Sequence, residues 1–285
     1  MLNSSLKKEA VGKLKTEVTN YENAQKNVQK AALNLHNSRT SALEVIENVE
    51  RYINSIANSP KEFDKEFDAI CINTASFKAL SEITYDEKLM IKIAGGGSAA
   101  GVAAGVATAA FAPTAAMAIA TTFGTASTGA AISGLSGAAA TNAALAWLGG
   151  GALAAGGTGG GMAAGSALLA LAGPIGWSIG VASLVAGGLF ASKKNKEAAI
   201  KADEERLKIV KERHKIDAVQ YEIVELNSKT KKLMNELYKM IMNFTNSTQG
   251  ITSFKQYSLD QRQELIAIIN NTFSLSKLFM KEIGK

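Results

Sequence analysis

Charged side chains are missing from one long stretch of this chain: residues 93–192 contain no Asp, Glu, Lys, Arg or His. A soluble domain carries roughly a quarter charged residues, because its surface has to be hydrated. No solvent-facing side can be drawn for this stretch, so we expect it to be buried in lipid, or hidden by the rest of the chain or by partner chains. The soluble alternative is a Gly/Ala-rich disordered linker or fibrous segment. Linkers, however, do not usually carry apolar runs such as residues 168–171 and 181–185.

Cysteine and the aromatic residues are scarce. Cys71 is the only cysteine, which excludes an intrachain disulfide and a cysteine metal cluster. Aromatic residues make up 6% of the chain and are not interleaved with the basic ones, so the net charge of +6 does not indicate a nucleic-acid surface. We instead expect the positive charge to attract the protein to anionic lipid. The chain begins without the apolar core of a signal peptide, so we expect synthesis in the cytosol and, for a secreted protein, a leaderless route.

Motifs of catalysis are also absent. The sequence has no P-loop, no HExxH and no Cys/His spacing that would hold a metal. His36 and His214 are far apart, and each falls within a helical pattern. The serines of residues 93–192 have no His or Asp beside them that could activate a nucleophile. The sequence therefore predicts a protein that is not an enzyme and that has no cofactor and no metal.

Glycine is what the uncharged stretch has in abundance. Of the 26 glycines, only Gly12, Gly250 and Gly284 lie outside it. Glycines four residues apart stack on one helix face, and in a bilayer such faces allow helix backbones to pack closely. The glycines that we expect to pack membrane helices are Gly97, Gly101, Gly105, Gly157, Gly161, Gly165, Gly176 and Gly180.

Lysines flank the uncharged stretch at both ends. Basic residues on both sides favour two ends on the same side of a membrane, so we expect an even number of crossings: a hairpin most simply, with four crossings still open. The alternative is that these lysines begin solvated helix faces. The outer parts of the stretch are long enough to cross a bilayer, but their Ala/Gly content makes them only mildly hydrophobic. That suits a segment that is soluble while hidden and inserts on release. The flanking lysines are Lys88, Lys92, Lys193, Lys194 and Lys196.

Long amphipathic helices are predicted before the stretch. Over residues 11–56 the apolar side chains recur at alternating steps of three and four, the seam of a coiled coil or long bundle helix, with Gln25 and Arg39 as polar exceptions. Proline disfavours helical geometry in the residue before it, so this helix ends before Pro60, which then opens a second helix. Cys71 adjoins the apolar face of that second helix, so we expect a buried thiol.

A similar pattern follows the stretch. A long helix is predicted over about residues 194–246, with its seam from Ile209 to Phe244, followed by a turn at residues 246–250. Ser258 is predicted to cap a final helix that packs back along the long ones.

The predicted fold class is all-α: an elongated long-helix bundle with an uncharged Gly/Ala-rich helical hairpin that inserts into a membrane. Residues 1–92 form an N-terminal helical arm, residues 93–192 the glycine-zipper membrane segment, and residues 193–285 a C-terminal helical arm that packs on the first.

Two resemblances rest on these residues. The string 124–132, continued by residues 144–157 and 162–165, looks like a glycine-zipper segment that recurs in bacterial proteins of uncertain function. The overall plan resembles the alpha-helical pore-forming toxins of the cytolysin A and haemolysin BL type, in which a hydrophobic hairpin lies between long helices of a bundle. The uncharged stretch of this chain is longer and richer in glycine than the hairpin of those toxins.

Three functions are compatible with the sequence. The first is a pore-forming bacterial toxin or effector that converts from a soluble to a membrane-inserted form and permeabilises a target membrane, as a homo-oligomer or with related subunits. The second is a constitutive integral membrane scaffold whose coiled-coil arms bind a partner protein. The third is a cytosolic effector whose uncharged stretch is always covered by a chaperone or immunity protein. Solubility without detergent separates the first from the second.

Overall fold

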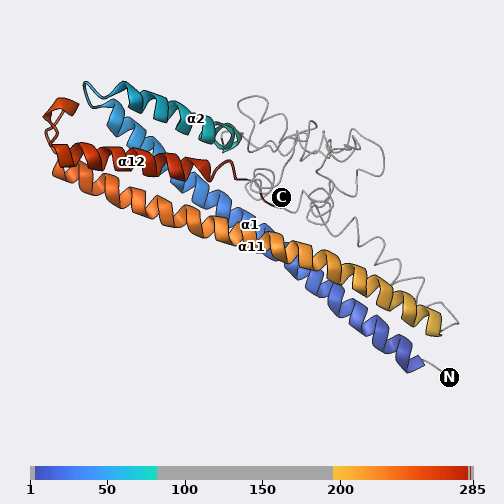
Figure 1. The fold of residues 1–285 in the computed structure, drawn as a ribbon. Helices are drawn as coiled ribbons and strands as arrows, with labels where there is room; N and C mark the ends of the chain where they lie inside the picture. The colour runs from blue at the N-terminus through green and yellow to red at the C-terminus, as the bar shows by residue number, and fades with distance from the viewer. Residues whose placement is uncertain (1–3, 82–194, 282, 284–285) are drawn as a thin grey trace, which may run out of the picture.

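A computed structural model describes residues 4–81, 195–281 and 283 of the chain. These residues form the long helices α1 (Ser4–Asn54) and α11 (Asn195–Ser247), the shorter helices α2 (Lys61–Ser81) and α12 (Leu259–Lys277), and a 3-10 turn, η3 (Phe254–Gln256) (Figure 1). The predicted all-α class is confirmed for the described residues, and the predicted hairpin lies outside them. None of the helices in the described ranges is both long and apolar enough to cross a bilayer.

Helices α1 and α11 lie side by side and run in the same direction (Figure 1). Near one end, the Arg213 guanidinium donates to the Glu17 carboxylate at 2.5 Å, between residues 196 apart in sequence. Near the other end, the hydroxyls of Tyr52 and Thr248 are 2.8 Å apart, again with a sequence separation of 196. A separation that is the same at both ends means that the two helices are parallel and in fixed register.

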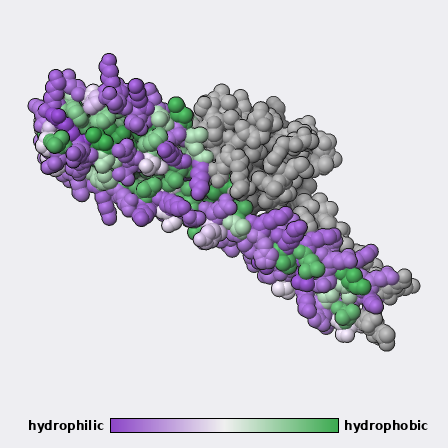
Figure 2. All heavy atoms as spheres, viewed as in Figure 1, coloured by the Kyte–Doolittle hydropathy of each residue, from purple (hydrophilic) through white to green (hydrophobic). Residues whose placement is uncertain are grey.

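The predicted seams of both long helices are confirmed. Every seam side chain from Val11 to Ile56, in α1 and just after its end, is buried, except the half-buried Val18. Along α11 the seam side chains are buried or half-buried, including the polar Thr230. The Thr230 hydroxyl donates to the Leu226 carbonyl at 2.8 Å, so that burial does not leave it without a partner. Figure 2 shows that the visible face of the described residues is largely hydrophilic, with apolar side chains scattered between.

Each long helix turns back into a shorter one at the same end of the molecule. Asn58, in the first turn, has φ 57°, a left-handed conformation that asparagine tolerates. Gly250 in the second turn has φ 83°, in the turn predicted for residues 246–250. The two turns are joined through Ala57, whose N–H donates to the Thr252 carbonyl and whose carbonyl accepts from the Phe254 N–H, both at 2.8 Å. We call α1, α2, α11 and α12 together the frame.

Ser258 caps α12 as predicted. Its hydroxyl accepts from the Gln261 N–H at 3.2 Å, and the Gln261 side chain accepts from the Ser258 N–H at 2.9 Å. This reciprocal capping box satisfies two backbone donors at the start of the helix. Helix α12 then packs on α11 and α2, with its apolar face buried at Leu265, Ile268, Ile269, Thr272 and Leu275.

Residues 81 and 195, which bound the segment containing the uncharged stretch, lie at different levels of the frame. Helix α2 ends beside the middle of α1. Two contacts show this position: the Phe77 ring lies against His36, and Lys78 pairs with Glu47. By the constant separation of 196, Asn195 is level with the first residues of α1. The part of α1 between these levels is about 50 Å long at 1.5 Å per residue.

Candidate functional site

A polar layer divides the core of the frame. One apolar cluster contains the α1 seam up to Leu35, and a second begins at Ala42. His36, Ser38 and Arg39, between the two clusters, are buried polar side chains. Because α2 ends at this level, the polar layer lies where the segment that contains the uncharged stretch leaves the frame.

Arg39 is the centre of this layer and is only 1% exposed. Its Nη2 donates to the Leu278 carbonyl at 2.7 Å, its guanidinium carbon lies 6.0 Å from the centroid of the Phe279 ring, and its Nε has no partner. Burial lowers the pKa of Arg39 to about 10. No carboxylate of the described residues forms an ion pair with it. Burying a charge without a counter-ion lowers the stability of the folded state. We therefore expect the polar layer to contribute less to stability than the two apolar clusters on either side of it.

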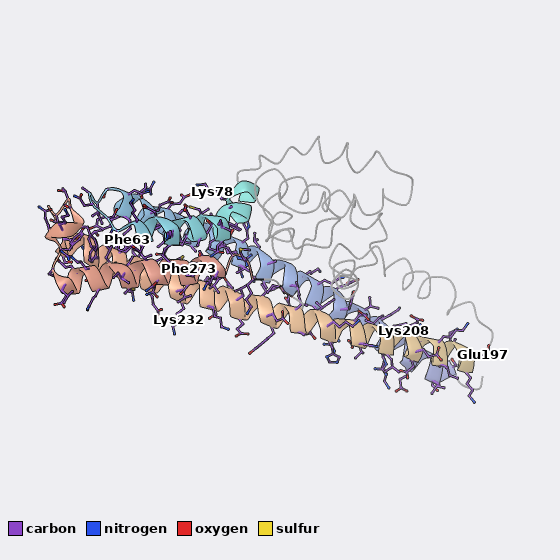
Figure 3. The ribbon with its side chains drawn as sticks, turned by 45° about the horizontal axis from the view of Figure 1, so that its top comes forward. Phe63, Lys78, Glu197, Lys208, Lys232 and Phe273 are labelled. Carbon is purple, nitrogen blue, oxygen red and sulfur yellow. The ribbon has the colours of Figure 1, made fainter. Side chains whose placement is uncertain are left out.

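Phe279 connects the C-terminal segment to α2 at the polar layer. Its ring lies 5.2 Å from that of Phe77 in an edge-on arrangement, and the Phe77 ring lies 5.2 Å from His36. Beyond it, Ile283 is buried in the other apolar cluster. We call His36, Arg39, Phe77, Leu278 and Phe279 the clasp, because they fasten the last turns of α2 to α1. Lys78, labelled in Figure 3, marks this end of α2.

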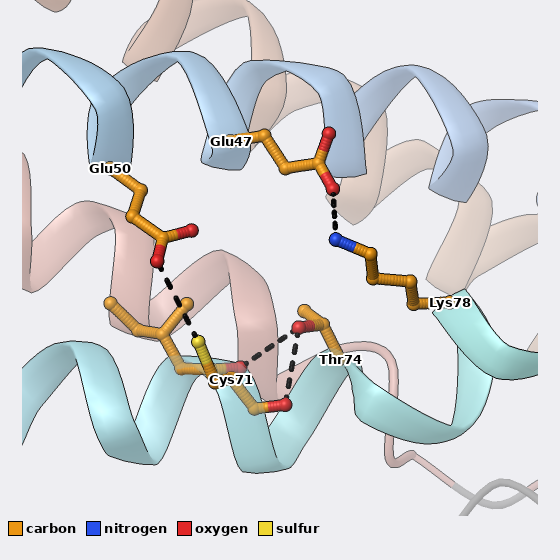
Figure 4. Close-up of polar contacts among 6 residues, drawn as sticks. Glu47, Glu50, Cys71, Thr74 and Lys78 are labelled. Atoms are coloured by element: carbon orange, nitrogen blue, oxygen red, sulfur yellow. Dashed lines mark hydrogen bonds and ion pairs between the residues drawn. The ribbon is translucent and has the colours of Figure 1, made fainter. Parts of the chain in front are cut away.

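Figure 4 shows polar contacts between α2 and α1. Lys78 Nζ lies 2.8 Å from Glu47 Oε1, in a pair whose side chains are 52% and 35% exposed. Such a surface pair contributes about 1 kcal/mol or less. The Asn73 amide donates to the Ser276 hydroxyl at 2.9 Å and so fastens α2 to α12. The burial of aromatic rings, rather than these contacts, therefore holds α2 in place.

The prediction that Cys71 is a buried thiol is wrong. The residue is exposed, because the buried stripe of α2 is narrow and runs through Phe67, Ile70 and Thr74, leaving the next position outside it. The thiol lies 4.0 Å from Glu50 Oε1 (Figure 4). Partial burial, with the nearby carboxylates of Glu50 and Asp68, raises the pKa of Cys71 and keeps it a thiol at neutral pH.

Most residues predicted for membrane insertion lie outside the described residues. Lys196 is the exception, and it is exposed in the first turn of α11. The clasp was not predicted, because the contact between Arg39 and Leu278 joins residues 239 apart in sequence. The one signal that could have found it was Arg39, a charged residue at a seam position. The predicted residues outside the described ranges are Gly97, Gly101, Gly105, Gly157, Gly161, Gly165, Gly176, Gly180, Lys88, Lys92, Lys193 and Lys194.

Comparisons of the chain with protein-family models, with curated proteins and with solved structures found no match. Within the described residues, no group of three or more His, Cys, Asp or Glu is placed to hold a metal ion. The function therefore has to be inferred from the uncharged stretch and from the frame helices that precede and follow it in the sequence.

His36 is expected to make the clasp sensitive to acid. Burial, and then the charge of Arg39, lowers the pKa of His36 below its ordinary value of 6.5, and its Nδ1 has no partner. The unfolded chain therefore takes up this proton before the folded one. The free energy of unfolding that depends on neutral His36 is fully present above about pH 6.5. It is lost as the pH falls through the pKa of His36 in the folded protein, at a rate of at most about 1.4 kcal/mol per pH unit.

Urea unfolding followed by circular dichroism between about pH 7 and about pH 5 measures this loss. We expect the midpoint to fall with pH in the wild type and to fall less in His36→Phe. His214→Gln, which removes an exposed histidine of α11, is the control for the loss of a histidine outside the clasp. Equal slopes for wild type and His36→Phe would contradict the assignment.

Proposed function

We propose that this protein is a membrane-inserting, pore-forming protein of the bacterial toxin or effector kind, which permeabilises a target membrane. The observation that carries the proposal is the stretch 93–192, with no charge, glycine at four-residue spacing and lysines at both ends. Such a stretch needs lipid or a protein cover, and glycine faces give its helices a way to pack in lipid. The protein would act as a homo-oligomer or with related subunits, and without enzyme chemistry, a cofactor or nucleic acid.

The separation of residues 81 and 195 supports a release step. With α2 docked, its end is about 50 Å from the level of Asn195. Residues 82–92 span at most about 40 Å when fully extended. A chain of that length ends short of the level of Asn195 while α2 stays in place. We call the end where α1 and α11 begin, and where no other frame helix lies beside them, the two-helix end of the frame. For both basic flanks to meet one membrane surface there, the last turns of α2 must leave α1.

The clasp is the set of contacts that this step breaks. In the proposed mechanism the C-terminal segment holds Phe77 against His36 in the soluble form. Once the clasp opens, α2 moves toward the two-helix end, the uncharged stretch enters lipid, and its glycine faces pack together. Burial of the unpaired Arg39 charge keeps the clasp from being too stable to open.

The first test is dye release from anionic liposomes by protein purified without detergent. Rapid, dose-dependent release supports a pore-forming protein. No release by soluble protein that binds the liposomes would favour a missing partner subunit. A protein that cannot be purified without detergent would instead support an integral membrane protein.

The glycine faces are tested by Gly101→Leu and Gly161→Leu. A leucine side chain on the packing face keeps helix backbones apart, so we expect severalfold slower dye release by each variant. Both positions lie outside the frame, so the unfolding of the frame should not change. Ala103→Leu adds the same bulk on a different helix face and serves as the control. Release at the wild-type rate in both glycine variants would count against glycine packing.

A constitutive integral membrane scaffold is the alternative. One specific observation favours it: the outside of α11 carries exposed apolar side chains that a partner could cover. A scaffold should require detergent throughout purification, whereas a toxin should not.

A further inference from the structure

The outer face of α11, opposite its seam with α1, carries a second apolar stripe. Its members fall at two heptad positions that neighbour each other on the helix surface and lie away from the seam. Polar side chains such as Asp217 and Lys231 occupy the same positions between them. On α1, a helix of similar length, Leu6 is the only large apolar side chain described as exposed. The stripe is therefore a feature of α11 and not of long helices in this frame. Its members, 43–70% exposed, are Ile200, Leu207, Tyr221, Val224, Tyr238 and Met242.

The spacing of the stripe is nearly the same in both directions. Tyr221 and Val224 are about one turn apart and form its centre. Leu207 lies two heptads before Tyr221, and Tyr238 lies two heptads after Val224. After a rotation by half a turn about this centre, Leu207 of one copy faces Tyr238 of another, and Tyr221 faces Val224. A two-fold interface between identical chains needs this self-complementary pattern.

The stripe is also large enough for a dimer. From Ile200 to Met242 the helix is about 63 Å long at 1.5 Å per residue. A contact strip as wide as one helix, about 10 Å, buries about 600 Å² on each copy. The total of about 1,200 Å² reaches the lower limit of specific, stable interfaces. We propose that α11 pairs with α11 of a second copy, antiparallel, through this stripe.

Charges beside the stripe favour the antiparallel direction. In that arrangement Glu204 faces Lys239 of the second copy, and Lys211 faces Lys232, so attraction and repulsion offset each other. The burial of apolar surface then supplies most of the affinity, and salt should change it little. A parallel pairing would instead bring Arg206 close to Lys211 of the second copy, with no opposite pair to offset the repulsion.

The dimer is tested by sedimentation velocity on the full-length protein. We expect the wild type to dimerise at micromolar concentrations, and the double variant Tyr221→Lys, Val224→Lys to be a monomer because it places like charges at the centre. Ile72→Lys changes an equally exposed apolar residue on α2 and should remain a dimer. A monomeric wild type, or a dimer that survives the double variant, would overturn the proposal. A dimer that salt strongly weakens would contradict pairing through the apolar stripe, because it would show that charges hold the two copies together.

The direction is tested by thiol cross-linking in expressing cells, which needs no purification. All variants carry Cys71→Ser, since the natural thiol is exposed. Two differently tagged copies, one with Leu207→Cys and one with Tyr238→Cys, should be joined by a short bismaleimide. Two copies that both carry Leu207→Cys should not be joined, and a link between them would show the parallel arrangement. Neither measurement involves permeabilisation, so failure of this proposal is distinct from failure of the proposed function.

Discussion

Phe279→Ala is expected to destabilise the frame by about 3–5 kcal/mol, the usual cost of removing a buried phenyl ring. The Phe279 side chain is 2% exposed and contacts both the Phe77 ring and the Arg39 guanidinium. Its loss leaves a cavity between three chain segments. The last turns of α2 lose their main apolar contact with the C-terminal segment, so they should detach before the rest of the frame unfolds.

Urea unfolding gives the total loss of stability, and hydrogen exchange of the backbone amides in α2 shows where it falls. We expect faster exchange in the last turns of α2 and little change in the seam of α1 with α11. Phe273→Ala is the matched control, since Phe273 is a half-buried ring of α12 outside the clasp (Figure 3). Equal losses in the two variants, with unchanged exchange in α2, would mean that Phe279 does not hold α2.

Local pattern predicted much of the frame. The steps of three and four between Val11 and Ile56 identified the buried side of α1, because a helix buries whatever its periodicity places on one face. The start of α12 was predicted from Ser258, because its capping box involves residues only three apart in sequence. Both features depend on neighbours in sequence, so the sequence alone is enough to find them.

The relative direction of the two long helices could not be predicted in this way. A seam is apolar whether its partner runs parallel or antiparallel, and the parallel direction is fixed by contacts such as Tyr52 with Thr248, which are remote in sequence. The position of Arg39 opposite Leu278 depends on the same packing. The wrong prediction for Cys71 has a related cause. Periodicity locates the centre of a buried helix face, but the width of that face depends on which neighbouring helices cover it, and Cys71 lies outside the covered part.

Arg39→Met is expected to act in the opposite direction to Phe279→Ala and to stabilise the frame. Replacing buried ionic groups with apolar side chains of similar volume often stabilises by about 1–4 kcal/mol. From this we subtract about 1 kcal/mol, because the Leu278 carbonyl loses its donor. The flexible Met side chain fills irregular space without a charge. The expected net gain is about 0–3 kcal/mol, and each kcal/mol gained should raise the unfolding temperature by about 2–4 °C. Arg51→Met, at an exposed position of the same helix, is the control and should change little.

The two clasp variants together separate stability from insertion. If α2 must leave the clasp before the uncharged stretch enters lipid, Arg39→Met should slow dye release and Phe279→Ala should speed it, in the order of their effects on the clasp. If the stretch inserts while α2 stays docked, both substitutions should shift the unfolding midpoint and leave the release rate unchanged. A release rate that is faster in Arg39→Met than in the wild type would fit neither route, because it would mean that the buried charge itself favours the docked state.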